Sequence, residues 1–227
     1  MAQTPDDAWR LQGTPYVWMA GSAGDIRPTA QAPTLHSSKS FSEVLGHLDG
    51  AFFVHGTARK QRWVALWDMT YASLSDKASL QPGLTIQGKL RQTSVSALAG
   101  YQVLANHPTH SLDVLGGVRW WHKRASVSVP QLQRQIGNSA SWVDPVLALR
   151  LRSQLAPRWS SLVYADGGGF GVGARSTWQL VATLNYQLQE RLHLSVGYRH
   201  QAVDYRNNGM LLDVQQGGPL LGATWQF

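Results

Sequence analysis

A regular alternation of apolar and polar side chains over residues 176–188 constrains the fold of this chain most strongly. Its apolar members, from Trp178 to Leu188, occupy even positions, and polar residues such as Gln179 and Thr183 fall between them. A period of two is that of a β-strand, and a length near ten residues suits a strand that crosses a bilayer at a tilt. The alternation returns over 192–199 after a tight turn at 189–190, so the two segments predict an antiparallel hairpin.

Eight further segments carry strand patterns: 16–22, 51–58, 63–71, 85–103, 112–120, 143–152, 159–166 and 219–227. We therefore predict one all-β domain over 1–227, a closed antiparallel transmembrane β-barrel of about ten strands, with eight or twelve as alternatives. Within 85–103 the apolar residues change from even to odd positions near Thr93. This change predicts a β-bulge there.

The connections between these strands alternate in length. Those at 59–62, 106–110, 157–158 and 189–190 are short, whereas those at 25–49, 75–83, 127–141, 167–175 and 206–218 are long. Outer-membrane barrels have short periplasmic turns and long external loops. The alternation therefore favours a bacterial outer-membrane location.

One segment, 41–49, has a helical pattern. Ser40 and Glu43 fit a capping box, and the apolar residues after them recur at helical spacing. We predict a short amphipathic helix in the first long loop. It should enter the barrel mouth, in or near the lumen, or rest on the outer-leaflet interface, and we favour a plug in the mouth.

Composition excludes several classes of protein. The mean hydropathy is −0.22 and no stretch approaches the roughly 18 apolar residues of a spanning helix, which excludes a helical membrane protein. With no cysteine there is no disulfide framework or thiolate site. The net charge of +7 comes without a nucleic-acid-binding motif, so we expect no nucleic-acid partner. The first residues resemble a mature N-terminus left after signal cleavage.

Strand parity places a set of charged residues on the inner wall of the barrel: Asp68, Asp113, Arg119, Asp144, Arg150, Arg152, Asp166 and Arg199. Buried charges must pair or remain hydrated. Two interpretations stay open, a structural ion-pair network that fills a narrow lumen or the lining of a narrow pore that selects by charge.

The other candidate sites are weaker. The eight histidines are scattered and the glycine-rich 167–173 lacks the context of a phosphate loop, so we predict no metal, cofactor or catalytic residue. Five basic residues fall on the predicted external rim: Lys77, Lys123, Arg124, Arg134 and Arg175. They form either a solvated surface or a clamp for lipopolysaccharide phosphates.

The C-terminal segment 221–227 alternates and ends on an aromatic residue, with Trp225 and Phe227 on one face. It resembles the signal that the barrel-assembly machinery of Gram-negative bacteria recognises. Together with 142–145, 166–173 and 218–222, it also resembles a poorly characterised family of proteobacterial outer-membrane barrel proteins. The resemblance implies fold and location, with membrane lipids, lipopolysaccharide and the assembly machinery as partners, and it implies no activity. At Ala174 and Arg175 the sequence departs from the family pattern.

Three functions remain open at this point. The first is a structural barrel or a narrow small-solute pore. The second is an outer-membrane lipid-modifying enzyme, which would need a serine and a histidine side by side on a lipid-accessible wall. The third is a soluble lipocalin-like barrel, in which the apolar face points inward.

Overall fold

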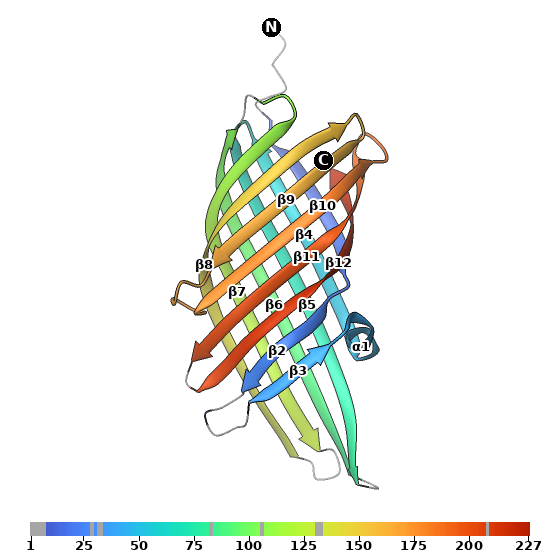
Figure 1. The fold of residues 1–227 in the computed structure, drawn as a ribbon, viewed down its shortest axis with the longest axis vertical. Helices are drawn as coiled ribbons and strands as arrows, with labels where there is room; N and C mark the ends of the chain where they lie inside the picture. The colour runs from blue at the N-terminus through green and yellow to red at the C-terminus, as the bar shows by residue number, and fades with distance from the viewer. Residues whose placement is uncertain are drawn as a thin grey trace.

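The computed structural model describes residues 8–27, 30, 34–81, 84–104, 107–129, 134–207 and 209–227, and the elements named below belong to this part of the chain (Figure 1). The strands and the helix are β1 (Arg10–Trp18), β2 (Gly21–Arg27), β3 (Leu35–Lys39), α1 (Phe41–Gly46), β4 (Leu48–Lys60), β5 (Trp63–Gln81), β6 (Leu84–Leu104), β7 (His110–Val129), β8 (Arg134–Ala156), β9 (Trp159–Gly168), β10 (Ser176–Gln187), β11 (Leu192–Asn207) and β12 (Met210–Gln226). Within the described residues, no helix has the length and apolarity needed to cross a membrane.

Ten of these strands, β1 and β4 to β12, form the barrel. Each pairs antiparallel with the next one along the chain, and β12 returns to pair with β1. This confirms the predicted closed antiparallel barrel. Nine of the ten predicted strand segments lie on its strands, whereas the segment 16–22 covers only the end of β1 and the start of β2. The two further strands, β2 and β3, extend the sheet at one end of β12.

The side chains divide cleanly between the two faces of the wall. Leu147, Leu180 and Val196 point outward and are 64, 45 and 50% exposed, whereas their inward neighbours Ala148 and Gln179 are buried. Aromatic pairs edge the outer face near the short turns, with ring centroids 5.3 Å apart for Trp63 and Tyr101. An apolar outer belt with an aromatic border is the surface of a barrel in a membrane. It contradicts the lipocalin-like alternative, which requires the apolar face inside.

Strands β5 to β8 are 19 to 23 residues long, about twice the length that crosses a bilayer. The bulge predicted near Thr93 is wrong, because Thr93 pairs in unbroken register with Tyr71 and with His122. The apolar residues change face for another reason. Beyond the bilayer the outward positions carry Lys89 and Arg91, and Leu90 points into an apolar part of the lumen.

The predicted loop at 25–49 is largely ordered structure. Strands β1 and β2 run along β12 in one continuous register, from Gln12 opposite Gln226 to Arg27 opposite Leu211. On their other edge they pair with β4 and β3, and α1 lies between those two strands. The helix is confirmed with its capping box: the Ser40 hydroxyl accepts from the N–H of Glu43, and the Glu43 carboxylate accepts from the N–H of Ser40. It ends at Gly46 rather than at 49.

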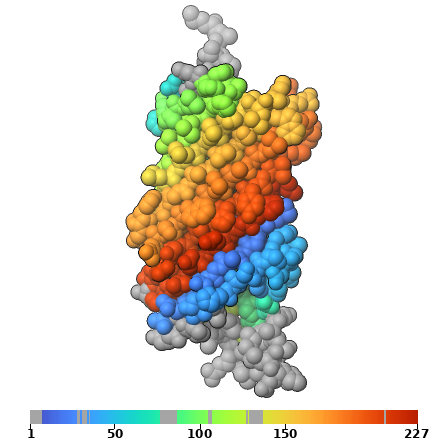
Figure 2. Space-filling model, viewed as in Figure 1, coloured from blue at the N-terminus to red at the C-terminus, as the bar shows by residue number. Residues whose placement is uncertain are grey.

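The preference for a plug is wrong. Helix α1 lies at the flank of the barrel, and in the space-filling view it belongs to the outer surface together with β2 and β3 (Figure 2). None of its residues is buried. At this level the lumen already holds aromatic side chains, with Trp18 and Phe53 at 6.3 Å between ring centroids, so the segment between β3 and β4 projects outward.

Candidate functional site in the lumen

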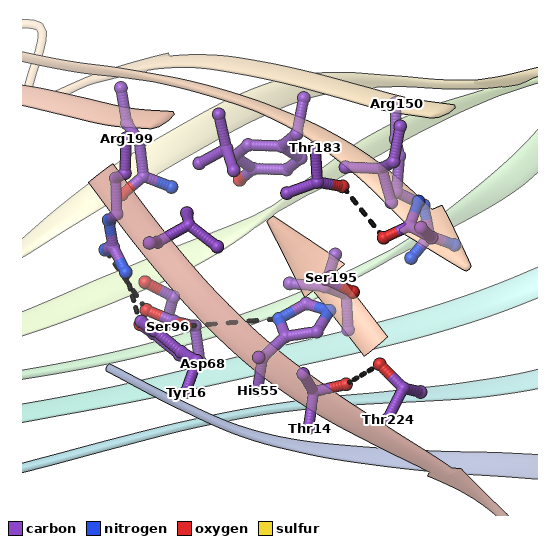
Figure 3. A pocket seen from close by; sticks show the side chains of 18 of the residues that line it. Thr14, Tyr16, His55, Asp68, Ser96, Arg150, Thr183, Ser195, Arg199 and Thr224 are labelled. Atoms are coloured by element: carbon purple, nitrogen blue, oxygen red, sulfur yellow. Dashed lines mark hydrogen bonds and ion pairs between the residues drawn. The ribbon is translucent and has the colours of Figure 1, made fainter. Parts of the chain in front are cut away.

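Ion pairs cross the lumen at mid-height, and Figure 3 shows the first of them. Arg199 on β11 reaches Asp68 on β5, with 3.2 Å between nitrogen and oxygen. The Tyr16 hydroxyl donates to the same carboxylate at 2.9 Å, and Arg199 also donates to Tyr16 and to Gln179. Since β5 and β11 are not neighbours in the sheet, these bonds join opposite walls.

A second pair lies beside the first. Arg119 on β7 holds Asp166 on β9 with two hydrogen bonds, of 3.1 and 2.5 Å, in a fork geometry. The Nε of Arg119 donates to the hydroxyl of Ser96 at 2.8 Å. Asp166 also accepts from Gln179, which links this pair to Arg199. Bidentate charge-assisted bonds of this kind are strong and fix orientation.

The third group centres on Asp113, which is 0% exposed. Arg59 on β4 donates to both of its oxygens at 2.9 and 2.8 Å, and Arg150 on β8 donates to one of them at 2.9 Å. Arg150 also donates to Thr57 on β4. One carboxylate thus ties three strands together: Arg150 is its cross-strand neighbour on β8, and Arg59 reaches it from β4 across the lumen.

We call these three groups the central layer: Asp68 with Arg199, Asp166 with Arg119, and Asp113 with Arg59 and Arg150. Beside it remains a cavity of about 130 Å³, lined partly by Leu66, Leu162 and Val181. A space of this size holds a few water molecules. The central layer therefore occupies much of the lumen at mid-height.

On the side of the short turns lies a larger cavity of about 440 Å³, which we call the vestibule. No described carboxylate lines it, whereas Arg152 and the four histidines His55, His107, His110 and His193 do. The Nε of Arg152 is buried and has no hydrogen-bond partner among the described residues. The vestibule is therefore cationic.

Asp144 has a different role from the other inward charges. It accepts from the indole N–H groups of Trp121 and Trp142, at 2.9 and 3.1 Å, and from the backbone N–H of Ala174 at 2.6 Å. Ala174 belongs to the glycine-rich loop between β9 and β10 and is 0% exposed. Asp144 thus anchors this loop against the inner wall. Gly173 is required there, because a Cβ would lie 2.5 Å from the carbonyl oxygen of Val143.

The predicted basic rim is partly wrong. Lys123 is buried on the inner wall, in the same parity as Arg119 and Trp121 on β7. Arg124 does lie on the outer face, directly opposite Arg91 of β6 and near Lys89, and these three residues form what we call the basic patch. Arg175 is 67% exposed. The side chains of Lys77 and Arg134 lie outside the described residues.

The structure places all eight predicted charges inside the barrel. Asp68, Arg119, Arg150 and Arg199 line the central cavity, Arg152 lines the vestibule, and the other three carboxylates are buried beneath their donors. Sequence reasoning missed Arg59, Tyr16 and Gln179. Their inward parity on β4, β1 and β10 was the available signal.

The histidines lie in ordinary structural contacts. No cluster of His, Cys, Asp or Glu in the described chain could hold a metal ion. One histidine does meet a serine, His110 with its Nδ1 2.8 Å from the Ser153 oxygen. This pair lines the vestibule, and no described carboxylate bonds to either member. By strand register the pair falls on the outward positions of β7 and β8, in line with Leu112 and Leu151. Among the described residues, it lacks the orienting acidic group behind the histidine that a hydrolase would need.

The fold and lumen define the class, a bacterial outer-membrane β-barrel. The outer membrane protease OmpT of Escherichia coli is similar over 100% of this chain and 99% of that one, with a TM-score of 0.62 and 10% identity. The translocator domain of the autotransporter NalP from Neisseria meningitidis is similar over 99% of this chain and 90% of that one, with a TM-score of 0.52 and 11% identity. No family model matches the sequence, and no curated protein matches it. At these identities the likeness concerns the fold alone.

Proposed function

We propose that this barrel is a narrow outer-membrane pore for small anions, with the central layer as its closed gate. The observation that carries the proposal is the vestibule, a 440 Å³ cavity with an unpaired arginine and no described carboxylate. The charged side chains described so far on the inner wall are six cations, Arg59, Arg119, Lys123, Arg150, Arg152 and Arg199, and four carboxylates, Asp68, Asp113, Asp144 and Asp166. A constriction with uncompensated charge selects ions by sign.

Passage requires the central layer to separate, because its residues occupy much of the lumen at mid-height. Planar bilayers with a potassium chloride gradient test this. The wild-type protein should show brief openings whose reversal potential lies toward that of chloride. Arg152→Gln should move the reversal potential toward zero. The control Arg175→Gln removes an exposed charge on an external loop and should leave the reversal potential unchanged. Cation-selective openings would refute the proposal.

A structural role is the second candidate, and the completeness of the ion pairs favours it. Arg119 and Asp113 are 1 and 0% exposed. Their buried ion pairs suit a permanent structural network as well as they suit a gate that opens. If neither the wild-type protein nor variants with a weakened central layer conduct ions in planar bilayers, the barrel has a structural role.

We further propose that the basic patch binds phosphate groups of lipopolysaccharide. Arg91 and Arg124 are direct cross-strand neighbours, and like charges in that position are destabilising unless an anion lies between them. Lipopolysaccharide added to the protein in detergent should raise its unfolding temperature. The double variant Arg91→Gln/Arg124→Gln should lose most of this shift. The control Arg158→Gln/Arg191→Gln, at exposed positions of the short turns, should keep it, and equal loss in both would contradict the proposal.

The remaining partner is the barrel-assembly machinery. We propose that Trp225 and Phe227 form the signal it reads, in keeping with membership of the proteobacterial family that the sequence resembles. Trp225 is 44% and Phe227 75% exposed, so neither is needed to fill the lumen. Phe227→Ala should therefore slow assembly by the purified machinery and leave spontaneous folding in detergent unchanged. If Phe227→Ala slowed assembly by the machinery and spontaneous folding in detergent equally, Phe227 would have a structural role instead.

A further inference from the structure

The barrel wall is interrupted beside α1. The ladder between β1 and β4 ends at the pair Pro15 and Val54, and the ladder between β2 and β3 begins at Ser22 and Lys39. Residues 16–21 and 48–53, all described, therefore have no ladder partner across this edge. Proline has no N–H to continue the ladder, which explains where it stops. We call this interruption the seam.

Helix α1 covers the seam without closing it. Its apolar residues Phe41, Val44 and Leu45 line a cavity of about 310 Å³. Val17, on the outer face of β1, lines the same cavity and is 58% exposed. Trp18 and Phe53, on the inner face, line it too. A cavity lined from both faces of one sheet passes through the wall, and this one links the lipid-facing surface to the outer half of the lumen.

At its inner end the cavity holds a buried cation. Lys123 lines it and is 8% exposed. Its ammonium lies 5.5 Å from the ring centroid of Trp121, and no described residue offers it a hydrogen-bond acceptor or a carboxylate. A buried ammonium with one aromatic contact leaves most of its bonding capacity unused. The site is thus complementary to an anionic group attached to an apolar body.

We propose that this cavity binds a long-chain carboxylate, a fatty acid, which enters from the outer leaflet through the seam. The alkyl chain lies along Phe41, Val44 and Phe53, and the carboxylate meets Lys123. At 310 Å³ the cavity is at the lower end of small-molecule sites, which suits one alkyl chain and excludes a lipid with several chains. This inference is independent of the anion pore, whose cationic vestibule lies on the other side of the central layer.

Native mass spectrometry of the protein released from detergent micelles tests the proposal with palmitate as the probe. One palmitate should bind per barrel. Lys123→Gln should weaken binding at least about ten-fold, which is the usual effect of losing one charge-assisted hydrogen bond. The matched control Lys89→Gln removes an outward lysine paired with Asp49 and should bind as the wild type does.

A competing amphiphile and a second variant distinguish specific binding in this cavity from unspecific association of palmitate with the protein and its detergent. Hexadecyltrimethylammonium has the same chain with the opposite charge and should not compete with palmitate. Val44→Asp places a carboxylate at the mouth of the cavity, and it should slow binding while the heat-modifiable gel shift shows an intact barrel. The proposal is overturned if the intact Lys123→Gln barrel binds palmitate as tightly as the wild type, or if the cationic amphiphile competes equally.

Discussion

Replacing Asp113 by Asn should cost more stability than any other single loss of a carboxylate in this barrel. Asp113 is 0% exposed and receives bonds from Arg59 and Arg150 at 2.8 to 2.9 Å. The substitution keeps the shape of the side chain and removes its charge, so the guanidinium groups of Arg59 and Arg150, which are 13 and 1% exposed, lose their counter-ion. Breaking a buried pair in this way costs about 3–5 kcal/mol.

The assay is urea unfolding of the protein in lipid vesicles, followed by tryptophan fluorescence and extrapolated linearly to water. Asp76→Asn is the control, because Asp76 is 54% exposed and its pairing with Lys39 belongs to the class of surface ion pairs worth about 0–1 kcal/mol. Adding Arg59→Gln to Asp113→Asn should recover part of the loss, since one unpaired charge disappears. If Asp113→Asn and Asp76→Asn destabilise by the same amount, the central layer is not a network of buried charges.

Two further predictions concern the loops and the helix. Gly173→Ala should destabilise by about 1–3 kcal/mol in the same assay, because its Cβ would lie 2.5 Å from the Val143 carbonyl oxygen; Gly167→Ala meets open space and should have little effect, and equal costs would refute the argument. Hydrogen bonds from Ser40 hold the pKa of Glu43 below its usual 4.5. Ionised Glu43 therefore stabilises α1 above that pH, and the contribution is lost as the pH falls through the lowered pKa. Amide-exchange protection of α1 should decline below about pH 4.5 in the wild type and not in Glu43→Gln, and identical profiles would exclude the capping box as the cause.

Strand parity predicted the wall of the barrel because lipid on one side and a polar lumen on the other impose a strict period of two. It placed Arg150 and Arg199 inside for that reason. It could also have placed Lys123, whose position on β7 has the same parity as Arg119. The rim assignment failed because β7 continues well beyond the bilayer, where a loop was expected.

The pairings themselves were not predictable from the sequence. Asp68 and Arg199 are 131 positions apart, and which walls face each other depends on the number of strands and on their tilt. The seam could not be predicted from the sequence for another reason. Residues 25–49 lack the alternation of a membrane strand, since β2 and β3 lie at the end of the wall. Only the capping box at Ser40 and Glu43 gave a local signal, and it predicted the helix correctly.

Thiol labelling tests most directly the claim that an apolar outer face surrounds a lumen closed at mid-height. The chain contains no cysteine, so one introduced cysteine reports alone. Leu180→Cys on the outer face should react with a lipid-soluble maleimide, and Asn185→Cys in the vestibule should react with a water-soluble thiosulfonate. Ser96→Cys, at a position 3% exposed beside Arg119, should react with neither. Water-soluble labelling of Ser96→Cys as fast as that of Asn185→Cys would show an open lumen and contradict the account.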